Sequence, residues 1–137
     1  MYTPSDDKRI HAGLLVLRIG IVAMFLYHGI PKLLAGPPRW SAVGGAMALF
    51  GIKFAPAFWG FMASVAEGVG GALLIAGLFT RCAAFFMFFT MVVAAATMFS
   101  KGGMADASHA ALAGIVFFSL LVSGPGRYSF DEARWRK

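Results

Sequence analysis

The stretch "RIGIVAMFLYHGIPKLL", residues 18–34, has the length of a membrane span but carries an arginine, a histidine and a lysine. About 20 apolar residues in an α-helix cross the roughly 30 Å of hydrocarbon in a bilayer. A charged side chain within that layer is costly unless it faces protein or a water-filled cavity. The stretch therefore predicts a spanning helix with one face turned toward the rest of the protein.

The composition of the whole chain is that of an integral membrane protein. Of its 137 residues, 59% are hydrophobic and 13% are charged, and the mean hydropathy is +0.75. A soluble domain of this size needs more charge to cover its surface. The formal charge of +6 comes mostly from residues that flank the apolar runs, where cations anchor and orient membrane proteins. We therefore expect a lipid bilayer, and not a nucleic acid, around this chain.

Four apolar runs reach spanning length. They cover about residues 12–34, 56–79, 82–99 and 107–123. No ten-residue alternation of apolar and polar residues recurs, so the pattern does not favour a membrane β-barrel. We predict an all-α fold in a single domain: a four-helix transmembrane bundle.

The connection between the first two spans predicts a short additional helix. In "WSAVGGAMALFG", residues 40–51, bulky apolar residues recur at helical spacing. Such a helix would lie in the membrane interface or fold back over the bundle. An irregular loop is the alternative, because three glycines interrupt the segment.

The distribution of lysine and arginine orients the predicted bundle. Seven of these residues lie on the side of the two termini and four on the other, with Arg18 inside a span left uncounted. Cytoplasmic loops are the richer ones in such cations, so both termini are expected in the cytoplasm. The tail, residues 124–137, mixes aromatic residues with cations and is expected to lie on the cytoplasmic headgroups as an amphipathic segment. Arg81 and Arg127 are candidates there for contact with an anion or a lipid.

Three polar residues of the first span share one narrow arc of the helix. At 100° per residue, His28 lies about 80° from Arg18 and Lys32 about 40° from it. Glu67 lies near the middle of the second span, on a face of mostly small residues that lets another helix come close. A partner of opposite charge offsets much of the cost of burying a charge. We predict a buried polar cluster of Arg18, His28, Lys32 and Glu67, in which Arg18 pairs with Glu67.

Some of these polar residues have alternative interpretations. Lys32 lies near the membrane boundary, where its amine could extend toward the headgroups instead. His109, at the start of the fourth span, could share a level with His28, and two facing histidines are what a b-type haem requires. An ordinary hydrogen bond at each histidine is the interpretation that we favour, so we predict no metal site.

Several motifs together resemble those of the DoxX family of small bacterial membrane proteins. They are the arginine early in the first span, "HGIPK" at its end, "EGVGG" in the second span and "GPGRYS" after the fourth. The resemblance runs from about Leu14 to Asp131 and implies four helices in the bacterial cytoplasmic (inner) membrane. It singles out Arg18, His28, Gly29, Lys32, Glu67, Gly70, Gly71, Arg81, Gly126 and Arg127. Many relatives carry an acidic residue near the start of the fourth span, where this chain has His109.

The resemblance also implies an association with quinone-linked redox proteins. On this first hypothesis the chain is an accessory subunit that binds a quinone or docks a membrane oxidoreductase that does, and any activity of its own would be that of such a subunit. Tyr27, His28 and His109 are candidate contacts to the quinone or another ligand, and Glu67 could relay protons. The chain has no cysteine pair and no flavin or nicotinamide motif, so electrons would come from a bound cofactor or a partner.

Two other functions remain open. A non-enzymatic scaffold would use the polar core to fix helix register and its glycine-rich face to bind a second copy or another membrane subunit. A carrier of small solutes or protons would use the same cluster, but the sequence lacks the inverted repeat and broken spans of many transporters. We rank the carrier last.

Overall fold

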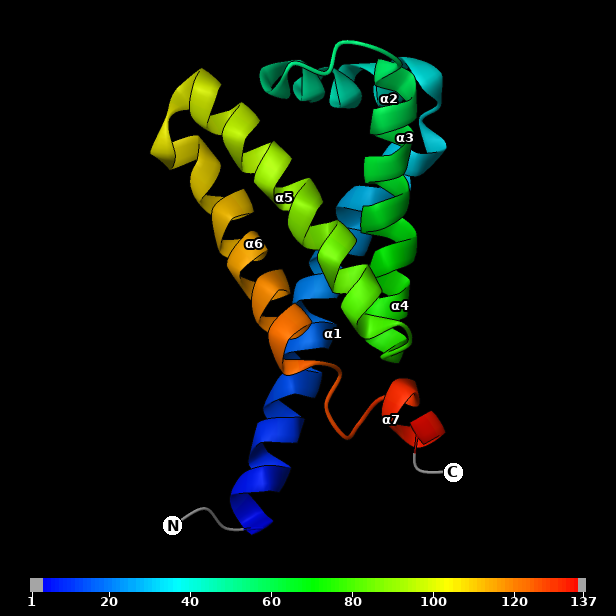
Figure 1. Cartoon of the computed structure of the whole chain (residues 1–137), viewed down its shortest axis with the longest axis vertical. Helices are drawn as coiled ribbons and strands as arrows, with labels where there is room; N and C mark the ends of the chain where they lie inside the picture. Colours follow the sequence, from blue (N-terminus) through cyan, green and yellow to red (C-terminus); the bar gives the residue numbers. More distant parts are fainter. Residues whose placement is uncertain (1–3, 136–137) are drawn as a thin grey trace.

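The computed structural model describes residues 4–135, and every regular element in that range is helical. Four helices of the described chain are long and apolar enough to cross a membrane. They are α1 (Pro4–Leu34), the composite of α3 (Pro56–Val65) with α4 (Gly71–Ala76), α5 (Thr80–Gly102) and α6 (Met104–Ser123). The prediction of an all-α fold with four spanning helices is therefore confirmed (Figure 1).

Helix α1 begins earlier than the apolar run indicated. It starts at Pro4 instead of near residue 12, and Asp6 and Asp7 in its first turn lie at the positive end of the helix dipole. Its 31 residues correspond to about 46 Å, more than the hydrocarbon thickness of a bilayer. The first turns of α1 therefore project beyond the other spanning helices (Figure 1).

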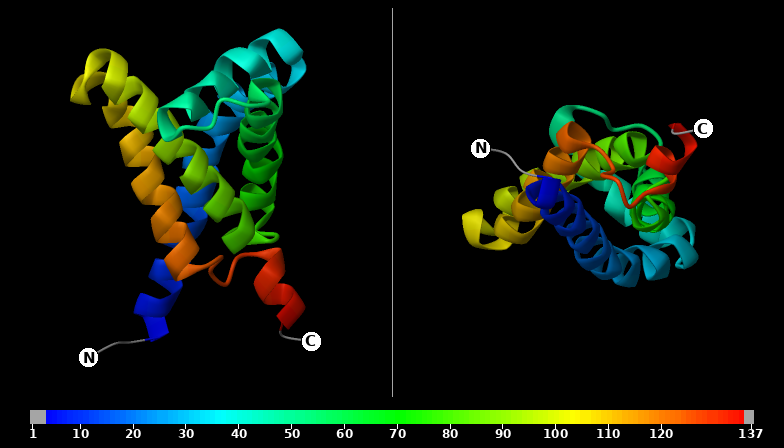
Figure 2. Two further views of the ribbon diagram at one scale, coloured as in Figure 1. Left: turned by 45° about the horizontal axis from the view of Figure 1, so that its top comes forward. Right: turned by 90° about the horizontal axis from the view of Figure 1, so that it is seen from below.

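The connection after α1 folds over one end of the molecule. It contains α2 (Pro37–Gly44) and the 3-10 helix η1 (Gly45–Phe50), so the predicted short helix between the first two spans is present. Helix α2 crosses α3 closely: a β-carbon on Gly44 would lie 1.8 Å from the carbonyl oxygen of Pro56. We call this end the far side, opposite the terminal side where both ends of the described chain lie (Figures 1 and 2).

The second span is not a continuous α-helix. Helix α3 ends at Val65, a π-helical segment η2 (Ala66–Gly70) follows, and α4 ends at Ala76, three residues before the predicted end. Gly77, with φ of 69°, then turns the chain, as glycine commonly does after a helix. A π-helical turn contains one residue more than an α-helical turn and is frequent at functional sites.

Helices α5 and α6 form an antiparallel hairpin that turns at Gly103, where φ is 74°. Small residues on both helices let them pack along much of their length. The buried core residues that these two helices contribute are Ala83, Ala84, Met87, Met91, Ala110, Ala113, Phe117 and Leu120. The rings of Phe25 and Phe117, 5.1 Å apart, connect α1 to the hairpin in an edge-on contact.

After α6 the chain stays on the terminal side and forms the short helix α7 (Phe130–Trp135). The view from below in Figure 2 shows this segment passing from α6 toward the end of α4. Large apolar side chains on the outer faces of the four spanning helices remain exposed, among them Val16, Phe86 and Leu112. In a bilayer such residues contact acyl chains and need no protein partner.

Candidate functional site

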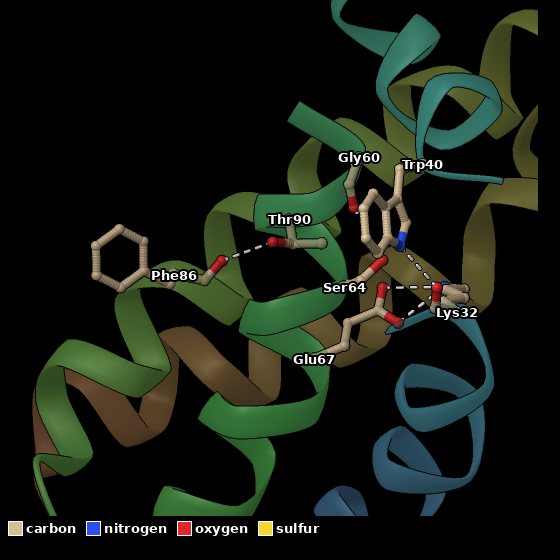
Figure 3. Close-up of polar contacts among 7 residues, drawn as sticks. All are labelled: Lys32, Trp40, Gly60, Ser64, Glu67, Phe86 and Thr90. Atoms are coloured by element: carbon tan, nitrogen blue, oxygen red, sulfur yellow. Dashed lines mark hydrogen bonds and ion pairs between the residues drawn. The ribbon is translucent and has the colours of Figure 1, made fainter. Parts of the chain in front are cut away.

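Lys32 and Glu67 form an ion pair toward the far side of the molecule (Figure 3). Nζ of Lys32 lies 2.8 Å from Oε2 and 3.1 Å from Oε1 of Glu67. The Glu67 side chain is 5% exposed and that of Lys32 is 29% exposed. The carboxylate is thus almost completely buried, whereas part of the lysine reaches the surface.

The close approach of α1 to the second span explains why these two residues meet. A β-carbon on Gly29 would lie 2.8 Å from Cβ of Glu67 and 2.9 Å from the backbone nitrogen of Gly68. No larger residue fits at that position without a shift of the backbone. Lys32 is three residues after Gly29, on the same face of α1, so its amine lies over the Glu67 carboxylate.

Helix α2 and the second span complete the surroundings of the pair (Figure 3). The indole nitrogen of Trp40 donates a hydrogen bond of 3.0 Å to the carbonyl oxygen of Lys32, near the end of α1. The buried hydroxyl of Ser64 donates to the carbonyl oxygen of Gly60 at 2.8 Å. A β-carbon on Gly60 would lie 1.7 Å from the carbonyl oxygen of Trp40, so glycine is required for this packing.

The predicted pair of Arg18 and Glu67 is wrong. Glu67 binds Lys32, and Arg18 and Glu67 lie at different depths along the bundle. Gly29 is level with Glu67, and Arg18 precedes it by 11 residues, or about 16 Å of helix. Arg18 instead lies beside Gly77, at the end of the second span, and therefore closer to the terminal side than the apolar run suggested. The proposal that the Lys32 amine extends to the headgroups is also wrong.

Arg18 is fully buried near the terminal side. Its Nη2 donates to the carbonyl oxygen of Tyr128, and a β-carbon on Gly77 would lie 2.2 Å from Nη1. Among the described residues, neither Nε nor Nη1 has a hydrogen-bond partner. The sequence thus placed Arg18 correctly inside the protein but in the wrong group of residues.

Asp131 of α7 joins the tail to the start of α5, a contact that no sequence motif indicated. Its Oδ1 and Oδ2 accept the backbone N–H groups of Phe79 and Thr80, each at 2.9 Å, while its own N–H donates to Gly77 at 2.9 Å. Partial burial acts to raise the pKa of Asp131, but the two N–H donors and the nearby Arg18 outweigh it and lower the pKa. The carboxylate caps a helix that is distant in sequence.

Tyr27 and His28 face outward from α1 and do not belong to a buried cluster. Both residues are exposed, Tyr27 by 78%, and their rings are 5.4 Å apart in an edge-on contact. The predicted burial of His28 is therefore wrong. His28 precedes Lys32 by four residues, however, so the exposed imidazole and the ion pair occupy adjacent turns of one face.

His109 is exposed on α6 and is not level with His28. The Phe25–Phe117 contact aligns α1 with α6; from it, His28 is about 4.5 Å and His109 about 12 Å toward the far side. The two histidines therefore do not face each other as ligands of one haem. In the described part of the chain, no three His, Cys, Asp or Glu side chains gather closely enough to hold a metal ion.

Arg81 and Arg127 both lie exposed on the terminal side. Nη1 of Arg127 is 3.2 Å from Oδ2 of Asp7, and the Arg127 backbone N–H donates to Nδ1 of His11 at 3.2 Å. The Arg81 guanidinium lies beside Gly124. Arg127 therefore has an anionic partner within the protein, which weakens its candidacy as a lipid contact.

Comparison with known proteins identifies the family of the chain. The sequence model of DoxX matches residues 13–100, more than half of the chain. The chain belongs to the DoxX family. Within the match lie Arg18, Lys32 and Glu67, whereas Arg127 and Asp131 lie beyond it.

Two relatives resemble this DoxX protein over most of its length. An uncharacterized protein of Haemophilus influenzae is 33% identical over an alignment of 136 positions, gaps included, which covers 88% of this chain and 90% of that protein. An uncharacterized membrane protein of Mycobacterium tuberculosis is 31% identical over an alignment of 153 positions, gaps included, which covers 94% of this chain and 88% of that protein. No solved structure matches the chain significantly.

Proposed function

We propose that this DoxX protein is an accessory subunit of a quinone-linked membrane oxidoreductase, and that the far-side cluster of His28, Lys32 and Glu67 contacts the quinone. One observation carries the proposal: a buried carboxylate is paired with Lys32, and an exposed imidazole lies one turn before that lysine on α1. An ionisable residue buried in a membrane span is a candidate functional group by default. The π-helical segment that holds Glu67 is a further feature frequent at functional sites.

The residues around His28 suit a quinone headgroup that approaches from the lipid. Such a headgroup needs hydrogen-bond donors for its carbonyl oxygens and an apolar surface for its ring and tail. His28, Tyr27 and the partly exposed Lys32 are the donors, and the exposed ring of Tyr27, 5.4 Å from that of His28, provides apolar surface. A bound quinone supplies two-electron, two-proton chemistry, with the electrons delivered by the oxidoreductase partner. The Lys32–Glu67 pair would hold or release a proton beside it.

A non-enzymatic scaffold is the second candidate, because the Lys32–Glu67 pair is complete in itself. Both carboxylate oxygens lie within hydrogen-bond distance of the lysine amine, and the contact ties α1 to η2. A role in fixing these helices would explain the pair without any ligand. Such a scaffold would bind a second copy of the chain or another membrane subunit.

The test of the quinone proposal compares what copurifies with three versions of the full chain. Each is extracted from native membranes in mild detergent, and the quinone content per protein is measured by chromatography of a solvent extract. We expect quinone in the unaltered chain, its loss in His28→Ala, and its retention in Met24→Ala. Met24 is exposed on the same helix, one turn before His28, so this control removes a side chain of similar size without a hydrogen-bond donor.

The same samples separate the two candidate functions. An unaltered chain without quinone, or equal quinone content in His28→Ala and Met24→Ala, contradicts the quinone site. If a membrane subunit nevertheless copurifies equally with all three versions, the scaffold function accounts for the result. Thermal unfolding of each version checks that the substitutions leave the fold intact.

A further inference from the structure

A groove on the terminal side lies between the end of α4 and α7. Its larger part has a volume of about 450 Å³ and is lined by Ala76, Leu78, Phe130, Ala133 and Arg134. A smaller part of about 260 Å³ shares Ala76, Phe130 and Ala133 and continues to Tyr128 and Ser129. The larger part alone has the volume of a small-molecule site. Its lining is apolar except at Arg134.

The groove lies at the end of the second span on the terminal side. Ala76 is the last residue of that spanning helix, and Leu78 belongs to the turn that follows it. Phe130 and Tyr128 are 66% and 51% exposed at the same end. Aromatic side chains gather at the level of lipid headgroups, so the groove has an apolar wall at the depth where acyl chains meet their headgroups.

The charge of the groove comes from Arg134. Within residues 4–135, the ion pairs of the structure do not include Arg134. Asp131, on the same helix, directs both carboxylate oxygens to Phe79 and Thr80, and Glu132 lines neither part of the groove. The cation is therefore available to an anionic group at one end of an apolar surface.

We propose that this groove binds an anionic glycerophospholipid of the leaflet on the terminal side. An acyl chain would lie along Ala76, Leu78 and Phe130, and the phosphate would bind Arg134. The combination of an apolar wall and the Arg134 cation, among the described residues, matches an amphiphile better than a free anion, which would gain nothing from the apolar residues. The site is at the opposite end of the molecule from the Lys32–Glu67 pair and is independent of the proposed quinone contact.

Native mass spectrometry of the full chain in detergent tests the site. Phosphatidylglycerol and phosphatidylcholine with identical acyl chains are added together, and the bound lipid is counted. We expect phosphatidylglycerol to be preferred by the unaltered chain. In Arg134→Gln its binding should fall about five-fold, the factor for one cation near an anionic surface. In Ala133→Leu, which fills the groove from an exposed position, both lipids should be lost.

Arg9→Gln is the matched control, because Arg9 is an exposed cation of α1 on the same side and lines neither part of the groove. It should bind phosphatidylglycerol like the unaltered chain. An equal loss in Arg9→Gln and Arg134→Gln would show attraction to the basic surface as a whole and overturn the proposal. Equal binding of the two lipids would overturn it as well. Displacement of the lipid by millimolar inorganic phosphate would assign the site to a free anion instead.

Discussion

Lys32 of α1 binds both carboxylate oxygens of Glu67 at a point where Gly29 brings the two spans into contact. The two charges differ in environment, since the glutamate side chain is 5% and the lysine side chain 29% exposed. Removal of the lysine therefore leaves a buried unpaired charge, whereas removal of the glutamate leaves a partly exposed one. The two substitutions should differ in their effect on the free energy of unfolding.

Replacement of Lys32 should destabilise the protein more than replacement of Glu67. Lys32→Met strands a buried carboxylate and should cost about 3 kcal/mol of unfolding free energy, in the range for broken buried pairs. Glu67→Gln leaves an amine that can turn toward the surface and should cost about 1 kcal/mol. Unfolding in mixed detergent micelles, followed by circular dichroism, measures both. A double variant should lose less than the sum of the two; strict additivity would mean that the pair contributes no coupling.

Two glycines of α1 should respond to alanine in opposite directions. Gly29→Ala places a β-carbon 2.8 Å from Cβ of Glu67 and should lower the free energy of unfolding by about 1–3 kcal/mol. A β-carbon on Gly20 would meet nothing within 4 Å, so Gly20→Ala should stabilise the helix by about 0.5–1 kcal/mol. Melting temperatures of the two variants in one detergent decide the matter. If both variants behave alike, the close contact at Gly29 is not formed.

The docking of α7 should weaken in acid. The pKa of Asp131 is lowered in the folded protein, so its contribution is present above the ordinary aspartate pKa of about 4 and is lost as the pH falls through the lower folded value. Spin labels on Cys82 and on the new thiol of Arg134→Cys would report the position of α7 by their separation. We expect one narrow distance distribution at pH 7 and a broader one in strong acid.

Asp131→Asn provides the control for that experiment. An asparagine side chain offers one oxygen acceptor where the two backbone N–H groups require two. Its distance distribution should therefore be broad already at pH 7 and should not change further in acid. A narrow distribution in this variant would show that α7 is held by other contacts.

The predicted orientation of the chain can be tested with its single cysteine. Cys82 is exposed at the start of α5, on the terminal side. If that side is cytoplasmic, a membrane-impermeant maleimide should label Cys82 only after spheroplasts are permeabilised. In a Cys82→Ser background, Lys53→Cys on the far side should be labelled in intact spheroplasts. The reverse pattern would place the termini outside.

The spanning helices could be predicted because apolar length is a local property of the sequence. Composition alone located α5 and α6 to within a few residues of their observed ends. It could not locate the start of α1, where the turn with Asp6 and Asp7 is helical but polar. Nor could it reveal the π-helical segment at Ala66–Gly70, because the apolar pattern does not distinguish a rare π-helical turn from an α-helical one.

The polar contacts were predicted less well, because shared helix face does not mean shared depth. Arg18 and Lys32 lie about 40° apart around α1 but about 21 Å apart along it. They therefore serve different ends of the molecule: Lys32 meets Glu67, while Arg18 meets the tail at Tyr128.

Helix α7 had a local signal, since Ser129 followed three residues later by Glu132 is the capping-box spacing. The hydroxyl of Ser129 accepts the Glu132 N–H at 3.2 Å. The bonds of Asp131 to α5 had no such signal, because they join segments about 50 residues apart.

The π-helical turn of the second span sets how its two halves are rotated. Removal of one residue from positions 66–70 would restore a regular α-helix and swing one half about 100° around the axis relative to the other. Gly60 against Trp40, and Gly71 against Val22 and Leu26, could not then both keep their neighbours. The number of residues in this turn therefore determines the rotation of one packing surface relative to the other. A substitution of one side chain for another cannot change that rotation in the same way.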